Sequence, residues 1–128
     1  MMKGLSDEKK EKLHEFVKFV KKQLDIKSMP TIAILSKRDG LKTTANYDHS
    51  KENKIIKVCA KNRALVDVMR SLAHELVHHK QFEQGRLKKQ PPDIGGEIED
   101  EANAKAGQYI KLYAKEVDSS IYDVDLND

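Results

Sequence analysis

The chain has 128 residues, of which 38% are hydrophobic, 35% are charged and only 5% are aromatic. This length suits one compact domain with a core of aliphatic side chains. No run reaches the roughly 18–20 apolar residues of a membrane-spanning helix, and charged residues from Lys3 to Lys10 interrupt the stretch where a secretory signal would be apolar. The single cysteine, Cys59, excludes an internal disulfide and a cysteine-rich zinc cluster. We therefore expect a cytoplasmic protein.

The charge balance separates the two ends of the chain. The formal net charge is +3, a weak excess for a protein whose primary partner is nucleic acid. Lysines are frequent in residues 1–27, where a solvated helix face explains them. No lysine or arginine follows Glu116, and acidic residues recur there. The prediction is one domain over residues 1–117 and an acidic C-terminal tail over 118–128.

The first half of the chain predicts a helix followed by three short strands. Apolar residues at three- and four-residue spacing indicate a helix over residues 6–26, with Ser6 as its N-cap. Short runs rich in β-branched residues then predict strands over 31–35, 43–47 and 54–61. Three strands cannot bury both faces of a sheet, so the flanking helices must cover one face.

The second half predicts two long helices. The first runs from about Asn62, a possible cap, to about residue 84, where Gly85 ends it. A loop over 86–96 contains prolines and glycines, and a last helix follows over 97–116. Together these elements predict an α+β fold: a helix, a small, mostly antiparallel three-stranded sheet, and two further helices.

The first of these two helices contains an H-E-x-x-H motif, His74-Glu75-Leu76-Val77-His78. Histidines at i and i+4 lie on one helix face and can share a metal ion. Glu75 points about 100° away from His74, where it can accept a proton from a metal-bound water rather than ligate. Zinc lowers the pKa of such a water to about 7. The alternative interpretation of this motif is two histidines without a metal, at the surface or in the core.

A catalytic zinc needs a third protein ligand and keeps its fourth position for water. The metzincin extension is absent, because Gln81 and Gln84 stand where it requires glycine and histidine. No histidine follows His79, so a downstream imidazole is excluded. Acidic residues at the start of the last helix remain, namely Glu97, Glu99, Asp100 and Glu101.

Helical geometry selects Glu99 among these acids. Glu99 precedes Ala102 by three residues and Ala106 by seven, on the apolar stripe that must face a neighbouring helix. A carboxylate on a packed face is costly unless it is paired or binds a metal. Glu97 and Glu101 lie on the more solvent-exposed side of the helix. Glu99 is therefore the predicted third ligand.

The remaining candidate groups receive no catalytic role. Tyr109, Tyr113 and Tyr122 could each donate a hydrogen bond to a developing oxyanion, but each is more typical of packing and none is assigned. His79 is expected at the rim or surface, because it points about 100° from the preceding histidine. Cys59 is expected to be a small buried strand residue rather than a nucleophile.

The run E-D-E-A-N at residues 99–103 resembles the E-x-x-A-(D/N) glutamate helix of gluzincin metallopeptidases. The order of the predicted elements resembles that of minigluzincins and of the protease part of ImmA/IrrE-like proteins, over roughly residues 30–116. This resemblance implies a zincin-like fold with an active-site helix followed by a glutamate helix.

The resemblance also implies roles for individual residues. His74, His78 and Glu99 would bind one catalytic Zn²⁺, and Glu75 would be the general base. Asn103 would orient a ligating histidine. Asparagine in place of the usual aspartate weakens the coupling to that histidine but still accepts a hydrogen bond.

We therefore expect a zinc-dependent endopeptidase that acts on a peptide or protein substrate. The resemblance implies that the strand around residues 54–59 borders the cleft. If that strand is a sheet edge, an extended peptide can pair with it. The alternative is a non-catalytic, zinc-stabilised regulatory or binding module, which the small size of the chain and the unassigned oxyanion donor favour.

Overall fold

The computed structural model describes residues 7–35, 45–48, 54–60, 63–86 and 96–124 of the chain. Its elements, in chain order, are α1 (Asp7–Leu24), β1 (Thr31–Leu35), β2 (Ala45–Asp48), β3 (Ile55–Cys59), α2 (Leu65–Glu83), α3 (Glu97–Glu116) and the 3-10 helix η1 (Ser119–Asp123). The predicted α+β class is confirmed, and α3 has the predicted bounds. The predicted caps Ser6 and Asn62, and most of the predicted loop 86–96, lie outside the described residues.

The sheet is mixed, whereas the sequence predicted a mostly antiparallel one. Its strand order is β1-β3-β2. β3 runs parallel to β1, with Thr31 opposite Ile55, and antiparallel to β2, with Tyr47 opposite Ile56. Apolar periodicity identifies a strand but carries no information on its neighbours, so the insertion of β3 between the other two strands was not predictable. β3 is therefore the central strand and both of its sides are hydrogen-bonded.

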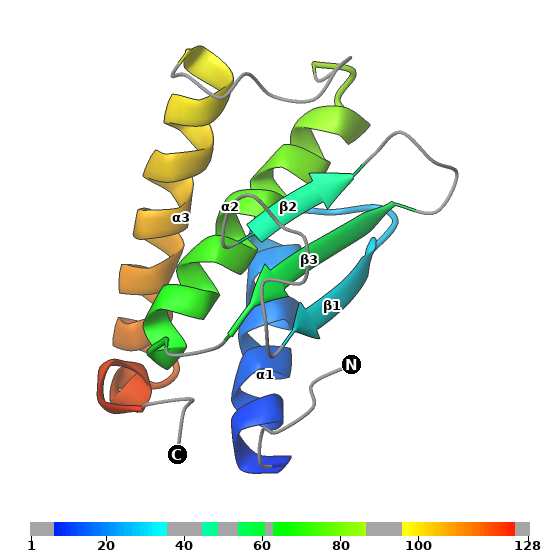
Figure 1. Ribbon diagram of the computed structural model, residues 1–128. Helices are drawn as coiled ribbons and strands as arrows, with labels where there is room; N and C mark the ends of the chain where they lie inside the picture. The colour runs from blue at the N-terminus through cyan, green and yellow to red at the C-terminus, as the bar shows by residue number, and fades with distance from the viewer. Residues whose placement is uncertain (1–6, 36–44, 49–53, 61–62, 87–95, 125–128) are drawn as a thin grey trace.

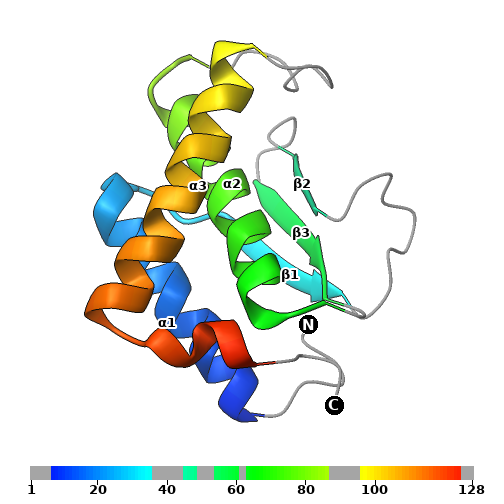
Figure 2. The same ribbon diagram turned by 90° about the vertical axis from the view of Figure 1, so that its left-hand side faces the viewer.

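All three long helices lie on one side of the sheet, as the edge-on view in Figure 2 shows. α2 packs directly against β2 and β3, α1 packs beside α2, and α3 covers the side of α2 remote from the sheet (Figure 1). The core between these layers is aliphatic with few rings, and includes Phe16, Ile56, Leu72 and Ile110. α2 is thus enclosed on two sides, and residues on opposite faces of this helix are both buried. None of the described helices has the length and apolar character needed to span a bilayer.

The C-terminus of α2 ends as the sequence predicted. Gly85 adopts a positive φ of 77°, a conformation that glycine tolerates without steric cost. Its N–H donates to the Phe82 carbonyl at 3.0 Å, and the Arg86 N–H donates to the Gln81 carbonyl at 2.9 Å. This pair of bonds is a Schellman motif, which satisfies carbonyls that the helix leaves unpaired. The motif fixes the end of the helix one turn beyond the H-E-x-x-H segment.

The described part of the predicted acidic tail over 118–128 packs against the helices. The Asp118 side chain caps η1 by accepting from the Ser120 N–H, and it pairs with Lys12 of α1 at 3.1 Å. Ile121 is 0% exposed, and the Val124 carbonyl accepts from the Leu65 N–H at 2.9 Å. The sequence did not predict this packing, because the segment contains several acidic residues and only one buried isoleucine. Residues 125–128 lie outside the described part.

Candidate metal centre

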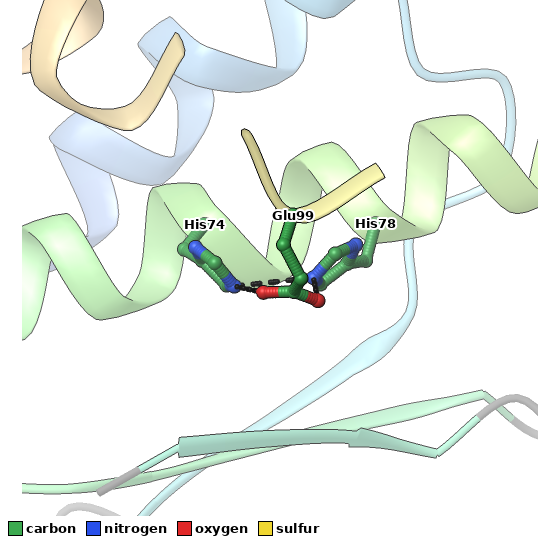
Figure 3. A group of neighbouring side chains, drawn as sticks. All are labelled: His74, His78 and Glu99. Atoms are coloured by element: carbon green, nitrogen blue, oxygen red, sulfur yellow. Dashed lines mark hydrogen bonds and ion pairs between the residues drawn. The ribbon is translucent and has the colours of Figure 1, made fainter. Parts of the chain in front are cut away.

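The packing of α3 against α2 brings three potential metal ligands together. His74 and His78 project from successive turns of α2, and Glu99 reaches them from the first turn of α3 (Figure 3). Glu99 lies 3.1 Å from His74 (Oε1 to Nε2) and 2.9 Å from His78 (Oε2 to Nε2). The two Nε2 atoms are 3.1 Å apart. One atom from each residue lies within 4.8 Å of the others, so this group can hold a metal ion.

Local sequence explains why Glu99 reaches the histidines. Ala102 and Ala106 are buried on the α3 face that meets α2, and their small side chains allow a close approach of the two helices. Glu99 lies one turn earlier on the same face, and is partly buried. Glu97, two residues earlier, is exposed. The structure therefore brings the predicted acid, and not Glu97, into contact with the H-E-x-x-H histidines.

The donor chemistry of the group fits a divalent transition metal. Two imidazole nitrogens and one carboxylate form a donor set that Zn²⁺ accepts, with room for a further position. His78 is only 2% exposed. Burial, and next the proximity of His78, lower the pKa of His74. The lowered pKa favours the neutral imidazole, which is the form that binds metals.

Asn103 lies where the resemblance predicted a residue that orients a histidine. Its side chain hydrogen-bonds His74 from the second turn of α3. This bond raises the pKa of His74, although burial and the second histidine outweigh it. A ring that accepts a metal at one nitrogen is commonly held at the other by such a partner. Asn103 can therefore fix the orientation of the His74 ring.

Sequence reasoning missed a second amide, Gln81, which holds the other histidine. The Gln81 side chain lies one turn beyond His78, and its Oε1 is 2.7 Å from the Nδ1 of that ring. Its Nε2 donates to Glu101 Oε1 at 2.8 Å and to the Ile98 carbonyl at 3.1 Å. The spacing of three residues from His78 was the available signal. Glu101 was predicted on the more solvent-exposed side of α3. Its carboxylate in fact accepts hydrogen bonds from both Gln81 and Arg86.

Glu75, the predicted general base, is not one of the three grouped ligands. Its side chain is buried, with 8% of the residue exposed. Burial, and to a lesser extent the charge of Glu99, raise the pKa of Glu75 to about 8. The interaction of the two carboxylates indicates that Glu75 lies beside the group rather than in it. A carboxyl that is close to a metal site without binding the metal has the placement required of a proton acceptor.

The prediction that His79 lies at the rim or surface is wrong. The residue is 3% exposed, because its side of α2 faces β2 and the segment before β1 instead of solvent. Its Nε2 lies 2.5 Å from the Ser28 carbonyl, so this nitrogen carries the proton and donates. In the neutral imidazole, Nδ1 then accepts from the Tyr47 hydroxyl, at 2.7 Å. Both ring nitrogens are thus engaged by the protein.

The remaining candidates lie in the core or at the surface. Tyr113 packs edge-on against the rings of Phe16 and Phe19. Tyr109 is also buried, whereas Tyr122 is largely exposed. Cys59 lies buried in β3, as the sequence predicted. These positions give no reason to assign an oxyanion donor among the tyrosines.

The candidate centre therefore comprises three convergent ligands from two helices, a buried carboxyl beside them, and one amide partner for each histidine. Comparisons of the chain with models of protein families, with curated proteins and with solved structures found no match.

Proposed function

We propose that the chain is a zinc-dependent endopeptidase of the gluzincin type, in which Glu75 is the general base for the water that attacks the peptide bond. The observation that carries the proposal is the convergence of His74, His78 and Glu99, with Glu75 buried beside them. The three convergent residues would hold the ion. Zinc supplies Lewis acidity and lowers the pKa of a bound water to about 7.

The proposed role of Glu75 follows from its environment. Without a cation, burial keeps the pKa of this carboxyl at about 8. A divalent ion on the neighbouring ligands favours the carboxylate and lowers that pKa. The carboxylate can then take a proton from water at one of its oxygens. The same oxygen can return this proton to the leaving amine nitrogen, as general acid–base catalysis of peptide hydrolysis requires.

The substrate in this proposal is a peptide or protein segment in an extended conformation. Pairing of such a segment with the strand at residues 54–59 was expected only if that strand is a sheet edge, and β3 is instead hydrogen-bonded to β1 on one side and to β2 on the other. A substrate strand can be added only to an outer strand of a sheet. The edge that accepts the substrate is therefore not provided by β3.

The test compares Glu75→Gln with the unmodified chain. Purified protein should contain about one zinc ion per chain and should digest casein or a peptide library, with a chelator abolishing the digestion. Glu75→Gln should retain the zinc and lose cleavage by about 10²–10⁴-fold, since the amide cannot accept the proton. Glu97→Gln makes the same chemical change at an exposed position of α3 and should leave cleavage unchanged. Full activity of Glu75→Gln would refute the assigned base.

A second candidate function is a non-catalytic module that zinc stabilises. The ligands join the middle of α2 to the first turn of α3, so a bound ion would cross-link the two helices. Such a protein would gain about 2.7 kcal/mol of stability at a zinc concentration of 100 Kd. It would cleave none of the peptides in the library, and Glu75→Gln would change nothing. The digestion experiment above therefore separates the two functions.

A further inference from the structure

The side-chain amide of Gln81 is buried, with 1% of the residue exposed, and its orientation is fixed by α3. An amide NH₂ group has two donor hydrogens. Both are used, because Nε2 lies 3.1 Å from the Ile98 carbonyl and 2.8 Å from Glu101 Oε1. Turning the amide over would place its oxygen against two acceptors, which is unfavourable in a buried site. Oε1 of Gln81 must therefore face His78.

This orientation determines which nitrogen of His78 carries a proton. Gln81 Oε1 is an acceptor only, so the Nδ1 atom that lies 2.7 Å from it must donate. In a neutral imidazole the other nitrogen then presents its lone pair. That nitrogen, Nε2, is the atom that lies 2.9 Å from Glu99 and 3.1 Å from the Nε2 of His74. The lone pair of His78 thus points to the centre of the ligand group.

The outer end of this chain of hydrogen bonds is anchored by charge. Glu101 accepts from Gln81 and from Arg86 Nη1, the latter at 2.9 Å. Glu101 Oε1 therefore accepts from the Gln81 amide and from the Arg86 guanidinium at the same time. The Gln81 amide thus links α2 to the first turns of α3, next to the ligand group.

We propose that Gln81 is a positioning residue, which keeps the proton of His78 on Nδ1 and directs the lone pair of Nε2 into the metal centre, and that Glu101 holds the amide in this orientation. The proposal rests on the metal-binding part of the proposed function, but not on peptidase activity.

The experiment measures two properties of the full chain in parallel. The first is zinc affinity, from competition with a chromophoric chelator. The second is the His78 Nδ1–H resonance in ¹H–¹⁵N NMR, followed with and without zinc. In Gln81→Leu, we expect zinc affinity to fall about 10–100-fold, the range for an outer partner of a histidine ligand. We also expect the Nδ1–H proton to exchange faster with solvent, because its acceptor is gone.

Three further variants separate positioning from general damage to the helix. Gln108→Leu makes the same change at an exposed position of α3 and should alter neither property. Glu101→Leu leaves Gln81 in place but removes the anchor of its amide. For Glu101→Leu we expect zinc affinity to fall by about 10-fold, the lower end of the range for such partners. Glu101→Gln should recover the affinity, because it restores an acceptor oxygen.

The outcomes that overturn the proposal are specific. Gln81→Leu with unchanged zinc affinity and an unchanged Nδ1–H exchange rate would show that the amide does not position His78. If Gln81→Leu does not fold, equal affinity in Glu101→Leu, Glu101→Gln and the unmodified chain has the same meaning. If the unmodified chain binds no zinc, the proposed function fails. The Nδ1–H exchange rate of the metal-free chain still tests the role of Gln81 in that case.

Discussion

His78 and His79 are neighbours in the chain and both are buried, yet their ring nitrogens have different partners. The His78 ring is held at one nitrogen by Gln81 and directs the other toward Glu99 and His74. The His79 ring uses one nitrogen to donate to the Ser28 carbonyl and the other to accept from Tyr47. Residue type and burial are therefore the same, and only the partners of the ring nitrogens differ.

This difference teaches which property makes a histidine a candidate ligand. A metal needs an imidazole nitrogen whose lone pair is not already committed to a hydrogen bond. His78 meets this condition, because its protein partner occupies Nδ1 only. His79 does not, since its remaining lone pair accepts from a buried tyrosine. His79 instead fastens α2 to β2 and to the segment before β1, which supports the helix that carries the ligands.

The largest expected effect comes from removing a ligand. Loss of a hydrogen-bond partner of a metal ligand weakens metal binding by about 10–100-fold. We expect His78→Ala and Glu99→Ala each to weaken zinc binding by more than this, because each variant loses a direct ligand. Metal analysis of the purified variants provides the measurement. Glu97→Ala, at an exposed position two residues before Glu99, is the matched control and should keep its zinc. Equal zinc content in Glu99→Ala and Glu97→Ala would remove α3 from the metal site.

A change at His79 should affect stability instead of zinc binding. His79→Phe keeps a ring but leaves the Ser28 carbonyl and the Tyr47 hydroxyl without this partner. The variant loses two hydrogen bonds, each with a net contribution of about 0.5–1.5 kcal/mol, so we expect a loss of about 1–3 kcal/mol in the free energy of unfolding. Urea denaturation measures this loss, and zinc affinity should stay within the range of the unmodified chain. A loss of zinc without a loss of stability would reverse the assignment of the two histidines.

The smallest expected effect is that of Tyr47→Phe, which removes only the hydroxyl that donates to His79. We expect a loss of about 1 kcal/mol near neutral pH. Burial, and next the charges of Glu83 and Asp48, raise the pKa of Tyr47 above its ordinary value of 10.0. The folded chain therefore keeps this proton when the unfolded chain releases it, so folding stability falls as the pH rises above about 10.

Tyr47→Phe should make this alkaline loss smaller, and denaturation curves at several pH values between neutral and alkaline provide the measurement. The groups near the phenol are His79, which accepts from it, and the carboxylates of Glu83 and Asp48. An identical alkaline loss in the variant and in the unmodified chain would show that Tyr47 does not contribute to it.

The sequence by itself determined the features that depend on helix geometry. The i, i+4 spacing placed His74 and His78 on one face of α2, and the apolar stripe of α3 selected Glu99. Gly85 marked the end of α2, because few other residues adopt its positive φ at low cost. These features follow from 3.6 residues per turn and from local backbone preference, so no knowledge of distant contacts is needed.

Only the tertiary structure decided the features that depend on which elements meet. β3 became the central strand, His79 faced β2 instead of solvent, and the segment around Ile121 packed against the core. The bond from Gln81 to Glu101 likewise joins two helices across a gap in sequence. Periodicity shows which face of an element is apolar, but not which partner covers it. The partners are chosen by long-range packing, because burial gains the same free energy per unit area against any apolar neighbour.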